Sequence, residues 1–503
     1  MVLTSLAVLW PGLTDQSSYL LLAALIATTA TFLLHFLDPL SSIPGPFWAR
    51  WSPLWMINHS LNGDMHRTMI HLHDKHGALV RTGPKEVSTS DPSAIQEIYG
   101  SCVGSKFMKS DWYSVWQGRR KFDLFPERDA KVHGSQRRFV NSIYSMSGLR
   151  ELEPYLDDVL RVLLDRLGEV DGKRIDMSYW AQLFAFDVIG ELTFSKRFGF
   201  LDTANDKGTF AQIESALQSA AWIGQVPWLY WVHDWLAPWI GNHLGITNRN
   251  GILRQIAAKE VEQRKTRDGA HRDILEKLMK VHRKTPEQFD GTAVLSMASS
   301  NIFAGSDTTA ISIGAILYYL CKYPDFKARL VDEILAEAKE GSIERGLVPW
   351  EVARKMPYLQ ACIHEGLRCH PAVGMSMPRV VPAEGITVDG KYLPGGTVIG
   401  ANPWVVHRNK QVFGDDADTF RPDRWLEDDA NVKERFFLAF GAGSRTCLGK
   451  SLSLIEISKL LPCLLLENDM EFADPSADIV ESCWWFVKIQ GLFLRLTRRE
   501  GFS

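Results

Sequence analysis

A segment of thirty-one residues with a single charge constrains the fold more than any other part of the sequence. Residues 291–321 read GTAVLSMASSNIFAGSDTTAISIGAILYYLC, and Asp307 is the one formally charged residue among them. The segment predicts a very long helix that is apolar on most sides, which must run through the centre of a domain or cross a membrane. Its many Ser, Thr and Asn residues favour the protein interior. The chain is therefore expected to build a large domain around this helix.

The middle of the expected helix carries the motif AGSDTT at residues 304–309. Gly305 weakens helical structure, and Ser and Thr hydroxyls can hydrogen-bond back to the chain. A helix loosened beside one buried acid, Asp307, and two threonines predicts a site for a small ligand and for protons. The alternative is a kink that is filled by hydroxyl groups of the core.

A glycine-rich turn near the C-terminus contains a cysteine. Residues 436–451 read FFLAFGAGSRTCLGKS, with Cys447 inside the turn. A dinucleotide-binding G-x-G-x-x-G would need glycine where Thr446 stands, and a phosphate-binding G-x-x-x-x-G-K-[ST] would need glycine where Ser444 stands. The remaining interpretation is a metal-binding thiolate that is held in a pocket of backbone N–H groups.

The composition is that of an ordinary globular chain, since 46% of its 503 residues are hydrophobic and 23% are charged. No long linker divides residues 52–503, which favours one large domain. The net charge of −3 gives no indication of nucleic acid as a partner. The seven cysteines form no C-x-x-C pair, so zinc ribbons and disulfide frameworks are not expected. The same pattern predicts that the protein resides in a reducing compartment. Cys362 and Cys369 are expected to be small core residues.

The hydrophobic patterns predict a mainly α fold with small β-sheets. Outside the central helix, apolar residues recur at helical spacing in some segments, and turn residues separate β-branched runs in others. The expected helices are residues 155–167, 325–340 and 356–371, and the expected strands lie in residues 78–92, 385–400 and 491–497.

The N-terminal region predicts a membrane anchor. Residues 19–37 contain no formally charged residue and, as a helix, are long enough to cross a bilayer. A signal peptide is the alternative, but residues 1–18 form a tail without Lys or Arg, and the apolar run is too long. Residues 38–51 follow as a proline-rich linker. Arg50, the first Lys or Arg of the chain, places residues 52–503 in the cytoplasm.

A third motif lies on the expected helix at residues 356–371. Glu365 and Arg368 are three residues apart, so they share a helix face and can form an ion pair. Apolar neighbours indicate that the pair is buried, and a buried pair needs further partners to satisfy its donors and acceptors. Arg424, in the segment TFRPDRW, is available as such a partner.

Together these motifs resemble those of the cytochrome P450 family of haem-thiolate monooxygenases. Residues 440–449 match its cysteine signature, F-x-x-G-x-R-x-C-x-G, residues 304–308 its oxygen motif, and residues 365–368 its E-x-x-R. The segment FRPDRW is similar to its F-x-P-E-R-F, with Asp423 and Trp425 in place of Glu and Phe. The anchor and the segment IPGPFWARW resemble the membrane-bound fungal members, some of which tailor secondary metabolites. The resemblance implies one large P450-like haem-binding domain after one N-terminal transmembrane helix.

The resemblance also implies a haem cofactor, with Cys447 as the axial thiolate ligand of its iron. Phe440 would cover the ring beside the sulfur, and the glycine-rich turn that begins at Gly441 would let backbone N–H groups point at the thiolate. The residues expected to contact the haem propionates are Arg445, His133 and Arg137, although the family more often has Trp where His133 stands.

The chemistry that the resemblance implies is the insertion of one oxygen atom from O2 into a hydrophobic small molecule. Thr308 is expected to hold dioxygen by a hydrogen bond and Asp307 to relay protons. Glu365, Arg368 and Arg424 are expected to be structural. No nucleotide-binding module is evident in the sequence. Electrons are therefore expected from a membrane-bound NADPH-dependent cytochrome P450 reductase at the endoplasmic reticulum.

Residues near the substrate are inferred from their position alone, and they are mostly apolar, which suits a hydrophobic ligand. Two other functions remain open at this point. One is a haem enzyme that isomerises or dehydrates peroxides without a reductase, against which the intact Asp307–Thr308 pair argues. The other is a membrane-anchored nucleotide-binding protein built on CLGKS, against which the motif spacing argues. The expected substrate-facing residues are Phe303, Ala304, Val373, Gly374, Met375, Phe486 and Val487.

Overall fold

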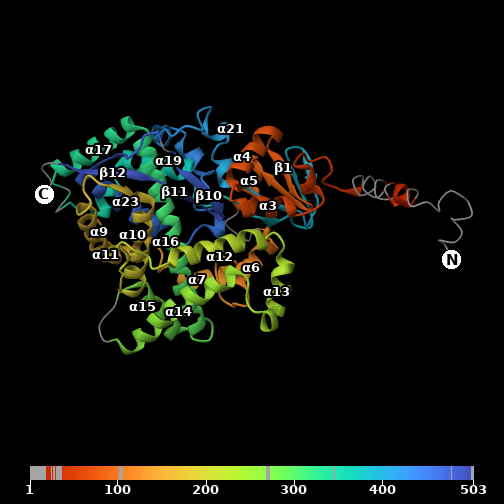
Figure 1. The fold of residues 1–503 in the computed structure, drawn as a ribbon, viewed down its shortest axis with the longest axis horizontal. Coiled ribbons are helices and arrows are strands. Elements are labelled where there is room, and N and C mark those ends of the chain that lie inside the picture. The colour runs from red at the N-terminus through yellow and green to blue at the C-terminus, as the bar shows by residue number, and fades with distance from the viewer. Residues whose placement is uncertain are drawn as a thin grey trace, which may run out of the picture.

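The computed structural model shows a mainly helical protein in which small sheets lie between and beside the helices (Figure 1). It describes residues 19–23, 25, 29, 37–100, 106–267, 272–341, 343, 346–476 and 478–499, without the side chains of residues 247–252 and 265. The main helices are α3 (Leu54–Asn62), α4 (Met65–His76), α5 (Pro92–Tyr99), α7 (Ala130–Val140), α9 (Glu153–Gly168), α10 (Met177–Phe194), α12 (Thr209–Ile223), α13 (Pro227–Ile240), α14 (Gly245–Thr266), α15 (Ile274–Lys284), α16 (Gly291–Lys322), α17 (Pro324–Lys339), α19 (Pro357–Cys369) and α23 (Lys450–Glu467).

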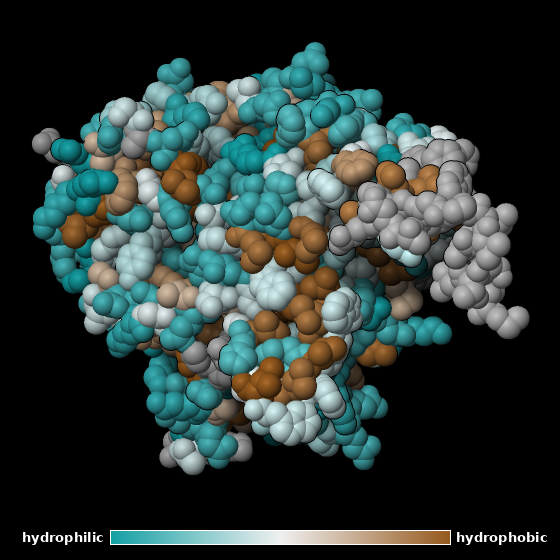
Figure 2. Space-filling model, turned by 45° about the vertical axis from the view of Figure 1, so that its right-hand side comes forward, coloured by the Kyte–Doolittle hydropathy of each residue, from teal (hydrophilic) through white to brown (hydrophobic). Residues whose placement is uncertain are grey.

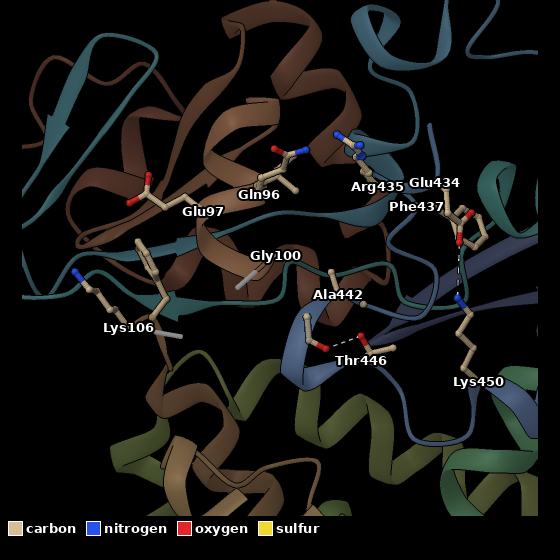
Figure 3. Close-up of a pocket in the computed structure, with 14 residues that line it drawn as sticks. Gln96, Glu97, Gly100, Lys106, Glu434, Arg435, Phe437, Ala442, Thr446 and Lys450 are labelled. Atoms are coloured by element: carbon tan, nitrogen blue, oxygen red, sulfur yellow. Dashed lines mark hydrogen bonds and ion pairs between the residues drawn. The ribbon is translucent and has the colours of Figure 1, made fainter. Parts of the chain in front are cut away.

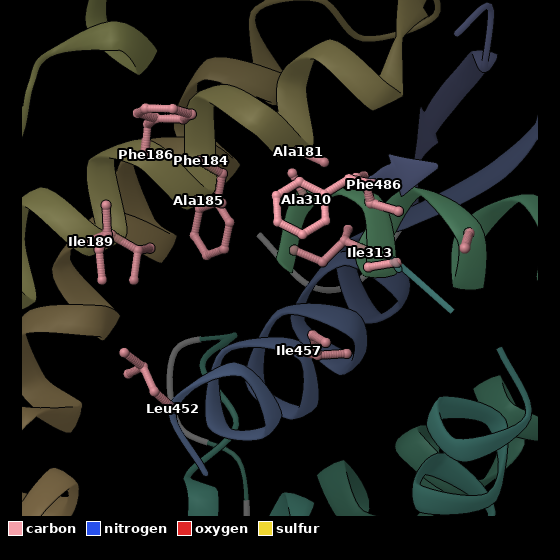
Figure 4. Packing of buried hydrophobic residues seen from close by; sticks show 14 of the residues in the cluster. Ala181, Phe184, Ala185, Phe186, Ile189, Ala310, Ile313, Leu452, Ile457 and Phe486 are labelled. Atoms are coloured by element: carbon pink, nitrogen blue, oxygen red, sulfur yellow. The ribbon is translucent and has the colours of Figure 1, made fainter. Parts of the chain in front are cut away.

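The predicted central helix is α16, which begins where the Asp290 side chain accepts a hydrogen bond from the N–H of Ala293. It packs against α10, α14, α19 and α23. In Figure 4, apolar side chains of α10, α16 and α23 meet in one core. The expected loosening at Gly305 is not found, because helical structure continues through it. Gly305 instead permits close packing, since a Cβ atom there would lie 2.9 Å from Cδ1 of Ile189 on α10.

The strands confirm the predicted small sheets. Residues 78–92 form the expected antiparallel hairpin, which joins strands from much later in the chain. The hairpin sheet has the order β1 (Leu79–Gly83), β2 (Glu86–Thr89), β8 (Val398–Gly400), β5 (Arg379–Val380) and β3 (Met108–Lys109). The other sheets pair β6 (Ile386–Val388) with β7 (Lys391–Leu393), β10 (Val480–Trp484) with β11 (Phe486–Gln490), and β12 (Phe493–Arg498) with both β4 (Arg174–Asp176) and β9 (Asn468–Phe472).

The expected membrane anchor, residues 19–37, lies mostly outside the described residues. Within the described part of the chain, no helix combines the length and the apolar character that a bilayer span requires. The proline-rich segment that follows is packed on the domain, because Leu40 and Ile43 are buried in a core beneath the hairpin sheet. The carbonyl of Pro44 accepts a hydrogen bond of 2.7 Å from the N–H of Arg81 on β1.

Both cysteines that were predicted to be core residues are placed as expected. Cys362 and Cys369 are both buried on α19, and the cysteines of the described residues are unpaired. Cys102 lies outside the described residues.

Candidate active site

The cysteine turn is fixed by its own backbone. Gly441 and Gly443 have φ of +65° and +61°, a region in which glycine is favoured because it has no Cβ. The N–H of Cys447 donates to the carbonyl of Phe440 at 2.8 Å, which closes the turn. Helix α23 begins at Lys450, directly after the turn. The local sequence therefore holds the cysteine at the start of a long helix.

The Cys447 sulfur lies among groups that would stabilise a thiolate, although the effect of burial on its pKa is larger. Burial raises the pKa of the thiol, and the backbone N–H groups of Gly449 and Lys450 and the charge of Arg137 oppose this rise. The positive end of the α23 dipole acts in the same direction as these donors. Although protein surrounds it, the Cys447 side chain is accessible, which is the property of a group that lines an internal space.

The central helix has its open side at the predicted motif. Ala304 is exposed and Thr308 is half-buried, although Asp307 beside them is buried. Helix α16 lies against the helix that follows the cysteine turn, because Oγ1 of Thr309 donates to Oγ of Ser453 at 3.1 Å. The first turn of α23, which follows the cysteine turn, therefore packs against the part of α16 that carries the predicted motif.

The two predicted relay residues differ in their contacts. The Thr308 hydroxyl donates to the carbonyl of Ala304 at 2.8 Å, which is the predicted bond back to the chain. Asp307 points instead toward α10, where Nε2 of Gln182 donates to its Oδ1 at 2.6 Å. Asp307 is thus the buried acid that the sequence predicts, and Gln182 is a partner that no motif indicates.

Basic side chains gather beside the cysteine turn. Arg445 donates to the carbonyl of Glu127 at 2.8 Å, and Arg137 donates to the carbonyl of Thr446 at 2.7 Å. Burial, followed by the charge of Arg445, lowers the pKa of His133 to about 3, so this histidine is neutral at physiological pH. Burial, followed by the charge of another arginine, lowers the pKa of Arg445 to about 10.

Two members of this basic cluster are missing from the sequence prediction. Lys109 on β3 and Arg379 on β5 face each other across paired strands. Burial, followed by the charges of Arg379 and Arg445, lowers the pKa of Lys109 well below its usual value. Buried positive charges in such a group need an anion to offset their loss of hydration. Sheet pairing alone brings these two residues to the cluster, so no local motif could have indicated them.

The buried ion cluster around Glu365 forms as predicted. Glu365, Arg368 and Arg424 have no exposed surface, and Glu365 accepts two hydrogen bonds from Arg368, of 2.8 and 2.9 Å. Nε of Arg424 donates to Glu365 at 3.3 Å. Trp425, one of the departures from the family pattern, adds a donor through its Nε1 at 2.9 Å from Oε2 of Glu365. The cluster ties α19 to the segment that leads to the cysteine turn.

The expected substrate-facing residues converge from three segments. The rings of Phe303 on α16 and Phe486 on β11 lie 6.0 Å apart, and Phe486 forms a β-bridge with Val373. Met375 lies farther out, among the residues that line a separate cavity of about 180 Å³. An aromatic cluster that the sequence prediction missed adjoins Phe303, and its members are Trp112, Trp116, Phe125 and Trp485.

Comparison with known proteins matches residues 42–491 to the family described as Cytochrome P450. The chain belongs to the cytochrome P450 family. It is 38% identical to the cytochrome P450 monooxygenase hepC of Aspergillus oryzae over 88% of this chain and 89% of that protein. It is 36% identical to the cytochrome P450 monooxygenase cicH of Emericella nidulans over 92% of this chain and 95% of that protein. The predicted P450 monooxygenase with a haem cofactor is confirmed at the level of the family.

The site residues of this P450 fit a haem. The accessible sulfur of Cys447 provides an axial ligand of the required chemistry. Ala304 is exposed and Thr308 is half-buried on α16, which packs against the first turn of the helix that follows this cysteine. The basic cluster of Arg445, Arg137, Lys109 and Arg379, with the neutral His133, offers donors and positive charge to two propionate groups.

Proposed function

We propose that this chain is a reductase-dependent P450 monooxygenase that oxidises a hydrophobic small molecule in fungal secondary metabolism. The observation that carries the proposal is an accessible Cys447 directly before α23, the helix that packs against α16, on which Ala304 is exposed and Thr308 is half-buried. A haem held there by the Cys447 thiolate would supply the activation of dioxygen and the oxygen atom for insertion into the substrate.

The residues of the sequence motifs then have separate tasks. The N–H groups of Gly449 and Lys450 hold the thiolate charge of Cys447. Phe440 shields the sulfur, and the basic cluster binds the propionates and sets the orientation of the ring. The Thr308 hydroxyl gives up its bond to the Ala304 carbonyl and donates to dioxygen instead. Asp307 replaces the proton that Thr308 passes on.

The substrate class is proposed from the side chains that face the site. Phe303, Phe486 and Val373 form one wall, and the aromatic cluster that contains Trp116 extends this wall. Aromatic and aliphatic surfaces of this kind bind an apolar ligand by burying its hydrocarbon surface. The fungal origin of the relatives, and the fungal type of the N-terminal segment, support a place in secondary metabolism.

The electron donor is proposed to bind at a groove on the outer side of the cysteine turn. This groove has a volume of about 870 Å³ and is lined by Gly441, Gly443 and Thr446 of the turn. Figure 3 shows Gly100 and Lys106 on one side of it and Thr446 and Lys450 on the other. A reductase that binds here contacts Thr446, the residue directly before Cys447, which favours electron transfer. An NADPH-dependent cytochrome P450 reductase is the proposed partner.

The proposed location is the endoplasmic reticulum membrane, with residues 19–37 as anchor, residues 38–51 as linker and the catalytic domain, residues 52–503, in the cytoplasm. Exposed hydrophobic side chains support this proposal. Trp228, Trp235 and Trp239 of α13 are 64–70% exposed, and Phe47, Trp48 and Leu54 are exposed to a similar degree. Helix α12 contacts both α13 and α3, so the two groups lie on one side of the molecule.

Figure 2, in which this side is turned toward the viewer, shows hydrophobic side chains gathered on the surface. Tryptophan is enriched at membrane–water interfaces, and soluble surfaces rarely expose so many large apolar side chains together. A lipid surface is therefore the proposed partner of this face, and it would place the catalytic domain against the membrane.

The deciding experiment is turnover of fungal metabolite extracts by the purified protein with and without NADPH and reductase. The proposal expects a product that carries one atom of heavy-isotope dioxygen and forms only when both are present. A product that forms without them, and without oxygen from O2, would identify an isomerase or dehydratase instead. A colourless protein that binds nucleotide would reject both.

A further inference from the structure

The buried acid of the relay has a charged partner that no sequence motif indicates. The Asp307 side chain has no exposed surface, and its Oδ2 lies 3.6 Å from Nζ of Lys488 on β11. The Lys488 side chain is 11% exposed. Among the described residues, Oδ2 of Asp307 accepts no hydrogen bond, while Oδ1 is occupied by Gln182. Lys488 therefore neutralises the acid without using the lone pairs of Oδ2.

The register between β11 and α16 explains why these two residues meet. Phe486 and Lys488 are two residues apart on a strand, so both point to the same face, about 7 Å apart along the strand. Phe303 and Asp307 are four residues apart on a helix, so they also share a face, about 6 Å apart along the axis. The contact between the rings of Phe486 and Phe303, at 6.0 Å, sets the register in which Lys488 reaches Asp307.

We propose that Lys488 is a positioning residue for proton delivery, which offsets the burial of the Asp307 carboxyl group and holds its Oδ2 available to take up and pass on protons. This inference rests on the proposed function, in which Asp307 resupplies Thr308. A buried carboxylate without a cation is costly and takes up a proton permanently. With Lys488 beside it, Asp307 accepts one proton from solvent for each proton that it passes to the Thr308 hydroxyl, and it returns to the carboxylate.

The placement of Lys488 also separates this role from substrate binding. Lys488 lies on the same strand as Phe486, but its ammonium group meets the acid of α16 rather than the apolar wall. Gln182, on the opposite side of the acid, is half-buried and so gives the pair a route toward solvent through α10. Loss of the Lys488 charge should therefore change the share of oxygen that is released as peroxide more than it changes the affinity for an apolar ligand.

The test measures the share of NADPH electrons that appears as hydrogen peroxide in full-length holoenzyme with reductase and without substrate. Slow proton delivery releases oxygen as peroxide instead of water. Lys488→Met is expected to raise the peroxide share at least twofold. Lys488→Arg, which keeps the positive charge, is expected to have the peroxide share of the wild type. Lys488→Gln takes the place of the Met variant if that variant does not retain haem. Lys327→Met, which removes a mostly buried lysine paired with Asp469 elsewhere, is the matched control and should leave the share unchanged.

A second readout does not depend on activity. The drops in the melting midpoint caused by Lys488→Met and Asp307→Asn should be non-additive, because each removes the same ion pair. Additive drops, or a Lys488→Met enzyme with the peroxide share of wild type, would overturn the inference. Thr308→Ala separates the two proposals. If it raises peroxide while Lys488→Met does not, the role of Lys488 fails alone, and if neither does, the oxygen relay itself fails.

Discussion

Substitution of Glu365 by glutamine should destabilise the buried ion cluster that holds the segment before the cysteine turn in place. Glu365 has no exposed surface and accepts hydrogen bonds from Arg368, Arg424, Trp425 and the backbone N–H of Arg421. Glutamine removes the negative charge and directs an NH2 group at some of these donors. The two buried guanidinium groups then lose the carboxylate that they share.

The expected cost follows from what each arginine retains. Arg424 keeps an ion pair of 2.8 Å with Asp416, but Arg368 keeps only the backbone carbonyls of His407, Ala417 and Thr419 and a contact with Cys369. Breaking a buried ion pair costs about 3–5 kcal/mol. A domain has a free energy of unfolding of about 5–15 kcal/mol in total, so about a fifth or more of the stability is at stake.

The assay is urea unfolding of the Glu365→Gln protein, followed by tryptophan fluorescence and by the carbon monoxide difference spectrum that reports bound haem. Arg329→Gln is the matched control, because Arg329 forms an exposed pair with Asp423 at 2.7 Å in the same region. The control should lose no more than about 1 kcal/mol. If Glu365→Gln is as stable as this control, the cluster does not stabilise the fold and the argument is wrong.

Four further predictions test other parts of the site. Cys447→Ser should abolish the thiolate-shifted carbon monoxide band, and an unchanged band would reject Cys447 as ligand. Thr308→Ala should retain haem but release at least twice as much peroxide per NADPH, as measured by peroxidase assay. Burial lowers the pKa of His73 to about 4, so it is neutral in the fold while the unfolded chain takes up a proton below about 6.5. The stabilising contribution of neutral His73 should be fully present above that pH and should decrease as the pH falls toward 4. His73→Gln should reduce the slope of the free energy of unfolding against pH by about 1.4 kcal/mol per pH unit in this range, as measured by urea unfolding. In nanodiscs of brominated lipid, wild type should lose more tryptophan fluorescence than Trp235→Ser/Trp239→Ser, and equal quenching would contradict membrane contact by α13.

Much of the site could be predicted because its motifs are local. The backbone of the cysteine turn depends on Gly441 and Gly443, whose positive φ suits glycine, so the signature is readable as a string of letters. Glu365 and Arg368 meet because residues three apart share a helix face. The central helix follows from a long segment with the single charge of Asp307. The role of Gly305 could not be predicted from the local sequence, because it depends on close packing against Ile189 of another helix.

The amino-acid sequence by itself thus determined the family, the axial ligand candidate, the buried acid and the long helix that carries it. Only the tertiary structure decided which distant side chains complete the site. It brought Lys109 and Arg379 together by strand pairing, and it set Lys488 against Asp307 through the register of β11 on α16. The physical reason is that helix periodicity and turn geometry act over a few residues, whereas ion pairs form wherever packing brings opposite charges together.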